Sequence, residues 1–94
     1  MGQGMNEARS TLEQIREFVM PMAENMGVRS LSDEDSLTDA GIVDSLAVFR
    51  LVSFLEETFS VSIADEDIVI ENFDSIDKIN RLLTSKLGPR RHPV

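Results

Sequence analysis

The chain has 94 residues, which is enough for one small domain. Its formal net charge of −8 makes that domain acidic. The acidity argues against nucleic acid as a partner, because phosphate binding needs a basic surface. The absence of cysteine excludes a disulfide framework, a thiolate metal site and a thiol of the protein's own. With no apolar run long enough to span a membrane and no secretory signal, we expect a cytoplasmic monomer that does not bind membranes.

A first helix is predicted to begin after Ser10, because Ser10 and Glu13 have the spacing of a capping box. Pro21 falls inside the helical pattern and removes a backbone donor, so we expect a kink or a stop near Met20. Gly27 is the expected C-cap. The apolar residues at helical spacing, which predict a core face, are Leu12, Ile15, Phe18, Val19 and Met22.

Residues 28–43 form a long connection, and connections of this length are usually functional or pinned to the core. The acidic residues 33–35 raise calcium binding as an alternative. A calcium loop that began at Asp33 would need glycine where Thr38 stands and an oxygen ligand where Leu37 stands, so we expect no metal site. The residues expected to pin the connection are Leu31, Leu37 and Ile42.

A second amphipathic helix is predicted over 45–59, with Asp44 and Ser45 at its start, where side-chain oxygens accept from unpaired N–H groups. Its core stripe is predicted to be Val48, Leu51, Val52, Leu55 and Phe59. Its solvent side is predicted to be Leu46, Phe49, Arg50, Ser53 and Glu57. The two apolar residues on the solvent side indicate a contact surface, although single exposed apolar residues are also normal.

The segment after this helix is predicted to be a linker followed by a short helical turn. Residues 61–63 alternate like a strand but have no partner strand, so we interpret them as an extended linker. Residues 64–69 are expected to form one turn with an acidic start, with Ile68 and Ile70 facing the core.

A last helix is predicted to be capped by Asp74 or Ser75 and to end at Gly88-Pro89. Its apolar face is predicted to be Ile76, Ile79, Leu82, Leu83 and Leu87. Three cations suit its later turns: Lys78, Arg81 and Lys86.

These elements predict an all-α fold, a small antiparallel bundle of three longer helices plus a short third helix. The folded domain is expected to span 10–87. It would follow a disordered segment, 1–9, and precede a flexible basic tail, 88–94.

The tripeptide Asp44-Ser45-Leu46, which follows Gly41 and opens the second helix, resembles the attachment motif of acyl and peptidyl carrier proteins. The similarity extends from about Ser10 to Leu87. It includes Leu37 before the motif, the segment 56–59 after it, and the segment 72–76 that opens the last helix. The resemblance implies that Ser45 carries 4′-phosphopantetheine, whose thiol holds an acyl or aminoacyl group as a thioester.

The resemblance also implies partners. A phosphopantetheinyl transferase would modify Ser45 from coenzyme A and recognise Asp44. An adenylating ligase would load the cargo, and an acyltransferase or synthase would receive it. We interpret the five residues of the predicted solvent side, given above, as the docking face for the loading ligase and the acyltransferase. We expect no enzyme activity and no catalytic residues, because the sole histidine, His92, lies in the tail, far in sequence from Ser45.

Two features favour a discrete acyl or aminoacyl carrier of specialised biosynthesis over the carrier of fatty acid synthesis. Arg50 and Ala47 stand where fatty acid carriers commonly have acids, and the spacing from Gly41 to Asp44 resembles that of D-alanyl carriers. The fatty acid carrier is the second hypothesis. The hypothesis of another class is an acidic helical interaction module without a prosthetic group, in which Ser45 is a plain cap.

Overall fold

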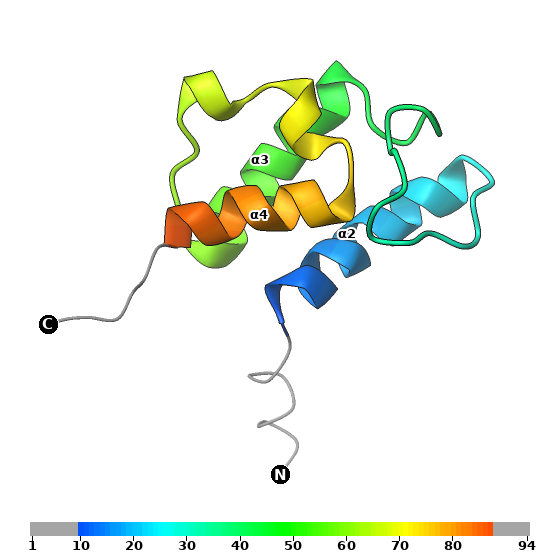
Figure 1. The fold of residues 1–94 in the computed structure, drawn as a ribbon, viewed down its shortest axis with the longest axis horizontal. Coiled ribbons are helices and arrows are strands. Elements are labelled where there is room, and N and C mark those ends of the chain that lie inside the picture. The colour runs from blue at the N-terminus through cyan, green and yellow to red at the C-terminus, as the bar shows by residue number, and fades with distance from the viewer. Residues whose placement is uncertain (1–9, 88–94) are drawn as a thin grey trace, which may run out of the picture.

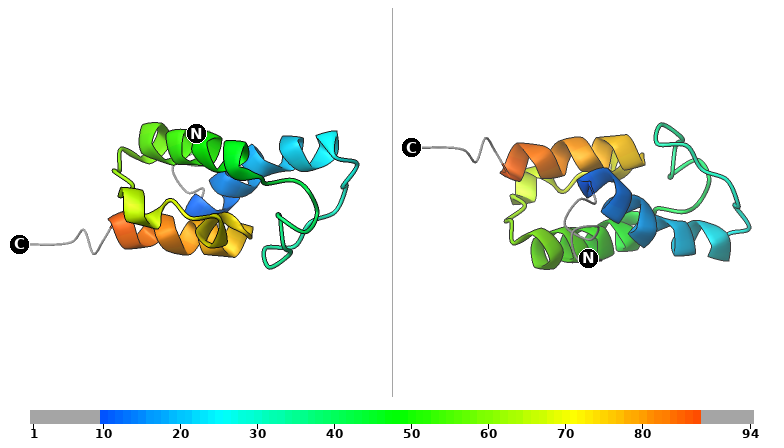
Figure 2. Two further views of the ribbon diagram at one scale, coloured as in Figure 1. Left: turned by 90° about the horizontal axis from the view of Figure 1, so that it is seen from above. Right: turned by 90° about the horizontal axis from the view of Figure 1, so that it is seen from below.

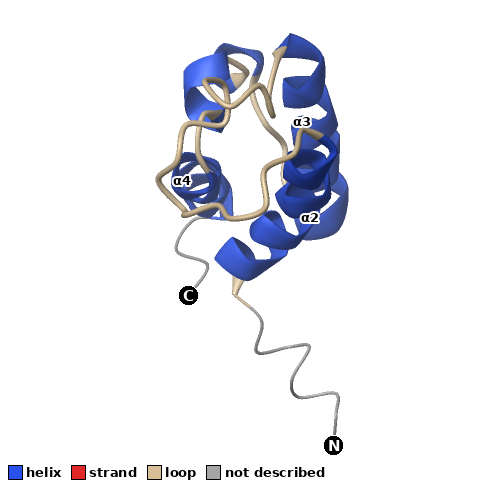
Figure 3. Ribbon diagram, turned by 90° about the vertical axis from the view of Figure 1, so that its right-hand side faces the viewer, coloured by secondary structure: helices blue, strands red, loops and turns tan. Residues whose placement is uncertain are grey.

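The computed structural model describes residues 10–87, which form three α-helices and two 3₁₀ turns. The elements are α2 (Thr11–Asn25), α3 (Ser45–Phe59), η1 (Asp65–Asp67), η2 (Ile70–Phe73) and α4 (Ile76–Leu87). The described part of the chain contains no strand, so the predicted all-α class is confirmed (Figure 3). The expectations for residues 1–9 and 88–94, including the end of the last helix at Gly88-Pro89, lie outside the described residues.

The three helices surround one core. In Figure 1, α2 runs from the lower centre to the right, whereas α3 and α4 both run from right to left. Seen from above and below, α3 and α4 form two opposite sides of the molecule, and α2 crosses between them (Figure 2). The fully buried core residues come from all three helices and from two of the segments between them: Ile15, Val19, Ala23, Leu37, Leu51, Leu55, Phe73, Ile76, Ile79 and Leu83.

Helix α2 begins as predicted, since Ser10 and Glu13 form a capping box in which the Ser10 Oγ accepts from the Glu13 N–H at 3.1 Å. Of the two expectations for Met20, a kink or a stop, the stop is wrong, because the helix continues through Pro21 to Asn25, and the kink stays a prediction. Beyond the proline, Ala23 is fully buried and Met22 packs against the core, so the apolar face of the helix continues past Pro21.

The C-cap of α2 is Met26 rather than the predicted Gly27, which is the next residue and ends the helix. The Gly27 φ of 81° lies in the left-handed region that glycine adopts without strain. The Gly27 N–H donates to Glu24 O, and the Val28 N–H donates to Ala23 O at 2.9 Å, which together make a Schellman motif.

The connection 28–43 is ordered by buried apolar side chains and by bonds to the helices. Leu31, Leu37 and Ile42 are buried, as predicted. The Arg16 guanidinium pairs with the Asp33 carboxylate at 2.6 Å, and the Asp33 carbonyl accepts from the Asp77 N–H of α4. The connection therefore contacts both α2 and the first turn of α4.

The segment between α3 and α4 contains two 3₁₀ turns rather than the single predicted one. Residues 61–63 lie outside any helix or strand, as predicted for a linker, and Ile63 within them is buried. Ile68 packs against the core, but the prediction that Ile70 faces the core is wrong. Ile70 begins η2 and is 42% exposed, because the buried aromatic side chain of that turn is Phe73.

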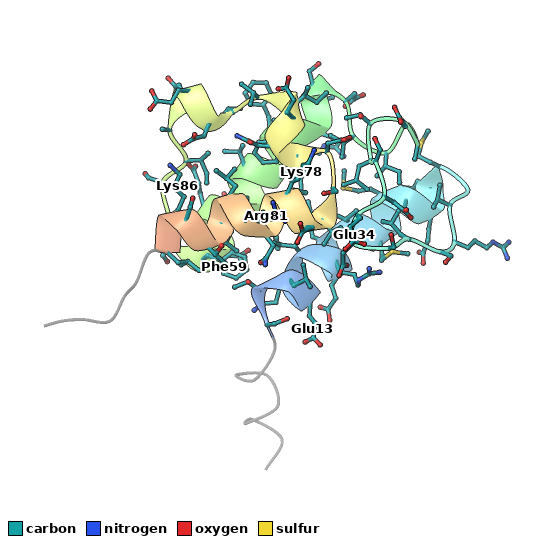
Figure 4. All side chains as sticks on the ribbon, viewed as in Figure 1. Glu13, Glu34, Phe59, Lys78, Arg81 and Lys86 are labelled. Carbon is teal, nitrogen blue, oxygen red and sulfur yellow. The ribbon has the colours of Figure 1, made fainter. Side chains whose placement is uncertain are left out.

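Helix α4 is capped by Ser75, whose Oγ accepts from the Lys78 N–H at 3.0 Å. Asp74, the other predicted cap, bonds instead to the connection 28–43. Near the end of α4, Lys86 forms an ion pair with Asp67 of η1 and so joins that turn to the last helix (Figure 4).

Candidate functional site

Ser45 is the first residue of α3 and is exposed to solvent. Its hydroxyl makes no hydrogen bond with any residue between 10 and 87. The side chain that caps the helix is Asp44, whose Oδ1 accepts from the Ala47 N–H at 2.9 Å. Asp44 therefore caps the helix, and the hydroxyl of Ser45 is left available for a covalent bond.

The backbone before Ser45 turns sharply to reach the helix. Gly41 adopts a φ of 76°, and a Cβ atom added to it would lie 3.3 Å from Met26 Cε. Ile42 and Val43 follow and are buried, so they fix the position at which the chain enters α3. The next side chains, those of Asp44 and Ser45, return to the surface.

The start of α3 suits a phosphate group attached to Ser45. The first N–H groups of a helix lack acceptors within it, and the helix dipole places partial positive charge at this end. Arg50, less than two turns further along α3, is exposed and forms no ion pair within the described part of the chain. The site therefore combines an accessible hydroxyl with a helix end that favours an anion.

All five residues of the predicted docking face line one shallow hollow of about 480 Å³. Leu46 and Phe49 are 65% and 60% exposed, as expected for a contact surface. The stripe predicted opposite this face is buried, apart from Phe59, which is partly exposed. The complete lining is Phe18, Leu46, Phe49, Arg50, Ser53, Phe54, Glu57 and Thr58.

Two aromatic residues of this hollow were not assigned to the face from the sequence. Phe18 was placed on the core face of α2, and Phe54 was placed on neither face of α3. Both are partly buried and pack against the core while they line the hollow. The signal in the sequence was weak, because a residue at the border of a helical stripe is apolar whether it faces the core or a groove.

A second hollow, of about 260 Å³, lies between α2 and the start of α3. Leu46 and Arg50 line both hollows, so the two adjoin at these residues. Asn25 and Met26 contribute from the end of α2, and Asp44 contributes from the start of α3. The surface around Ser45 is therefore polar on the side of α2 and apolar along the outer face of α3.

Neither a metal site nor a membrane span is found in the described ranges. Residues 10–87 contain no group of three or more acidic or histidine side chains placed to bind a metal ion. None of the helices within them is both long and apolar enough to cross a bilayer.

Comparison with known families gives one match. Residues 16–83 match the family model described as "Phosphopantetheine attachment site". The matched region contains all of α3, η1 and η2, together with about two thirds of α2 and about two thirds of α4. No curated protein matches the chain, and no solved structure matches it.

Proposed function

Because the chain belongs to the phosphopantetheine-attachment family, whose members carry 4′-phosphopantetheine covalently on a serine, we propose that Ser45 is the attachment residue of this protein. The observation that carries the proposal is the exposed Ser45 hydroxyl, free of hydrogen bonds to the described residues, at the first position of α3. Asp44 supports it by capping the helix, because Ser45 then has no structural task of its own.

The chemistry of attachment is a transfer from coenzyme A by a phosphopantetheinyl transferase. The Ser45 Oγ forms a bond to the phosphorus that bears pantetheine, the bond from that phosphorus to 3′,5′-adenosine diphosphate breaks, and the transferase takes up the hydroxyl proton. The free N–H groups at the start of α3 favour the resulting phosphodiester anion. When bound, the group supplies the thiol on which cargo is held as a thioester, a function that the cysteine-free chain cannot perform itself.

The proposed role is that of a cytoplasmic, monomeric acyl or aminoacyl carrier of specialised biosynthesis. Arg50 supports this role, because an exposed cation on the docking face selects partners different from those that bind an acidic helix. Ala47 is only 7% exposed, so a partner has little access to its side chain. The proposed role in specialised biosynthesis therefore rests on Arg50 rather than on Ala47. The carrier of fatty acid synthesis remains the second candidate.

We propose that the loading ligase and the acyltransferase or synthase dock on the five predicted residues of α3. Leu46 and Phe49 supply exposed apolar area, and Arg50 and Glu57 supply charges of opposite sign within the same hollow. An apolar centre with charged neighbours is the usual composition of a specific protein interface. Its position beside Ser45 allows a partner to reach the attached group.

The direct test is the intact mass of the protein after incubation with coenzyme A, magnesium and a broad-specificity phosphopantetheinyl transferase. We expect the wild type and Ser53→Ala to gain one phosphopantetheine, and Ser45→Ala to gain none. Ser53 is the matched control, because it is an exposed serine on the same helix. No gain in folded wild type would favour an acidic interaction module in which Ser45 is a plain helix residue.

The choice of pathway needs a second assay on the modified protein. Adenylating ligases for D-alanine and other amino acids are compared with the malonyl transferase of fatty acid synthesis. Preferential aminoacyl loading would support specialised biosynthesis, whereas efficient malonyl loading alone would support the fatty acid carrier.

A further inference from the structure

Asp74, between η2 and α4, makes four hydrogen bonds to one turn of the connection that precedes the attachment site. Its Oδ1 accepts from Thr38 N at 3.1 Å, from Thr38 Oγ1 at 2.5 Å and from Ser36 Oγ at 2.8 Å. Its backbone carbonyl accepts from the Leu37 N–H at 2.6 Å. We call these contacts among residues 36–38 and Asp74 the Asp74 network.

The Asp74 network continues to the attachment site through the backbone of Leu37. The Leu37 carbonyl accepts from the Ile42 N–H at 2.9 Å and from the Val43 N–H at 3.1 Å. Leu37 is fully buried, and Ile42 and Val43 are nearly so. Asp44 and Ser45 follow directly. A chain of hydrogen bonds thus leads from Asp74 to the residue before the helix cap.

Asp74 is not needed to cap α4, because the Ser75 hydroxyl already does so. Asp74 is also not the only residue that bonds to the connection 28–43, since Arg16 of α2 forms an ion pair with Asp33 at 2.6 Å. The three donors to its carboxylate instead lower the pKa of Asp74, with the Thr38 hydroxyl making the largest contribution. Asp74 therefore acts as an anionic acceptor at one specific turn.

We propose that Asp74 is a positioning residue for the modification of Ser45: it fixes the turn 36–43 so that Asp44 and Ser45 meet the transferase in one orientation. This inference rests on the proposed function of Ser45. Without the carboxylate, the turn would populate orientations that do not bind the transferase. The apparent affinity of the transferase for the carrier is then reduced to the fraction of carrier molecules that keep the competent turn. The rate at saturating carrier does not change.

The test compares variants by the rate of phosphopantetheine transfer from coenzyme A over a range of carrier concentrations. If about a tenth of Asp74→Ala molecules keep the competent turn, KM for the carrier rises about tenfold at unchanged kcat. Asp74→Asn retains an acceptor oxygen and is expected to restore KM to within about twofold of wild type. Arg16→Ala is the control, because it breaks a tie elsewhere in the same connection and should leave KM unchanged.

A second readout does not depend on the transferase. Amide hydrogen exchange of Ile42 and Val43, both bonded to Leu37, should be faster in Asp74→Ala than in wild type. Exchange of Val19, buried in α2, should respond only to overall stability. If Asp74→Ala does not fold, the double variant Ser36→Ala, Thr38→Val removes both hydroxyl donors and must raise KM.

The outcomes separate the two proposals. Failure of the wild type to accept phosphopantetheine contradicts the function proposed for Ser45. Modified wild type together with an unchanged KM in folded Asp74→Ala, or an equal rise of KM in Arg16→Ala, overturns the positioning role of Asp74.

Discussion

The rings of Phe18 in α2 and Phe54 in α3 stack with their centroids 4.2 Å apart and their planes at 14°. Both rings also line the hollow that contains the proposed docking face. Phe54 in addition meets the edge of Phe59, at 5.9 Å and 88°. One aromatic pair thus joins two helices and forms the wall of the surface beside Ser45.

Truncation of either stacked ring is expected to lower the free energy of unfolding. Because both side chains are only partly buried, we expect Phe18→Ala and Phe54→Ala to cost about 2 kcal/mol each, with a coupling of about 1 kcal/mol in the double variant. Urea denaturation measures these values. Phe49→Ala is the control: its ring is 60% exposed, so its cost should stay below about 0.5 kcal/mol. An equal cost at Phe49 would contradict the assignment of that residue to the surface.

Charge reversal at Arg50 is expected to slow loading of the modified protein by its adenylating ligase. Like charges across an interface are penalised, and we expect Arg50→Glu to lower kcat/KM for loading about tenfold with little change in Tm. Arg29→Glu is the matched control, because it makes the same change in net charge at an exposed arginine that lines neither hollow beside Ser45. Equal rates for Arg50→Glu and wild type would place Arg50 outside the interface.

Two substitutions at Asp44 separate helix capping from recognition. Asparagine caps a helix about as well as aspartate, so Asp44→Asn should change stability by less than about 0.5 kcal/mol, whereas Asp44→Ala should cost about 1 kcal/mol. If the transferase recognises the carboxylate, both variants should be modified more slowly. Thermal unfolding and initial transfer rates measure the two effects, and a normal rate in Asp44→Asn would limit Asp44 to capping.

The lowered pKa of Asp74 predicts a specific dependence of the unfolding free energy on pH. The Thr38 hydroxyl, the main cause, holds the pKa of Asp74 below its ordinary value of 3.8 in the folded protein. A depressed pKa contributes stability that is fully present above the ordinary value and is lost as pH falls through the folded value. Wild type should therefore exceed Asp74→Asn in unfolding free energy at pH 7, and this difference should shrink below about pH 4.

Chemical denaturation of wild type and Asp74→Asn between pH 7 and pH 2.5 measures that difference. The comparison isolates Asp74 from Asp35, whose pKa is also lowered, chiefly by the Ser32 backbone N–H. A difference that grows toward low pH would contradict the assigned sign.

The helices and the exposed surface at the start of α3 were predictable because their signals are local. The capping box at Ser10, the left-handed glycine at Gly27 and the stripe of α3 each depend on residues within a few positions. The exposure of Leu46 and Phe49 follows from the same periodicity.

The features that the sequence left open or predicted wrongly depend on tertiary packing. Asp74 and Ser75 are equally good caps by type, and only the three-dimensional contact with Thr38 shows which one caps α4. The apolar face of α2 continues past Pro21 to the buried Ala23, and Phe73 rather than Ile70 fills the core beside η2. A local pattern does not record such competition between neighbouring apolar residues.

The most direct test of the carrier assignment is fragment mass spectrometry that locates phosphopantetheine on the protein after reaction with coenzyme A and the transferase. The account predicts the group on the peptide that contains Ser45, and on no other peptide. Modification of a different serine, or no modification of the folded wild type, would contradict it.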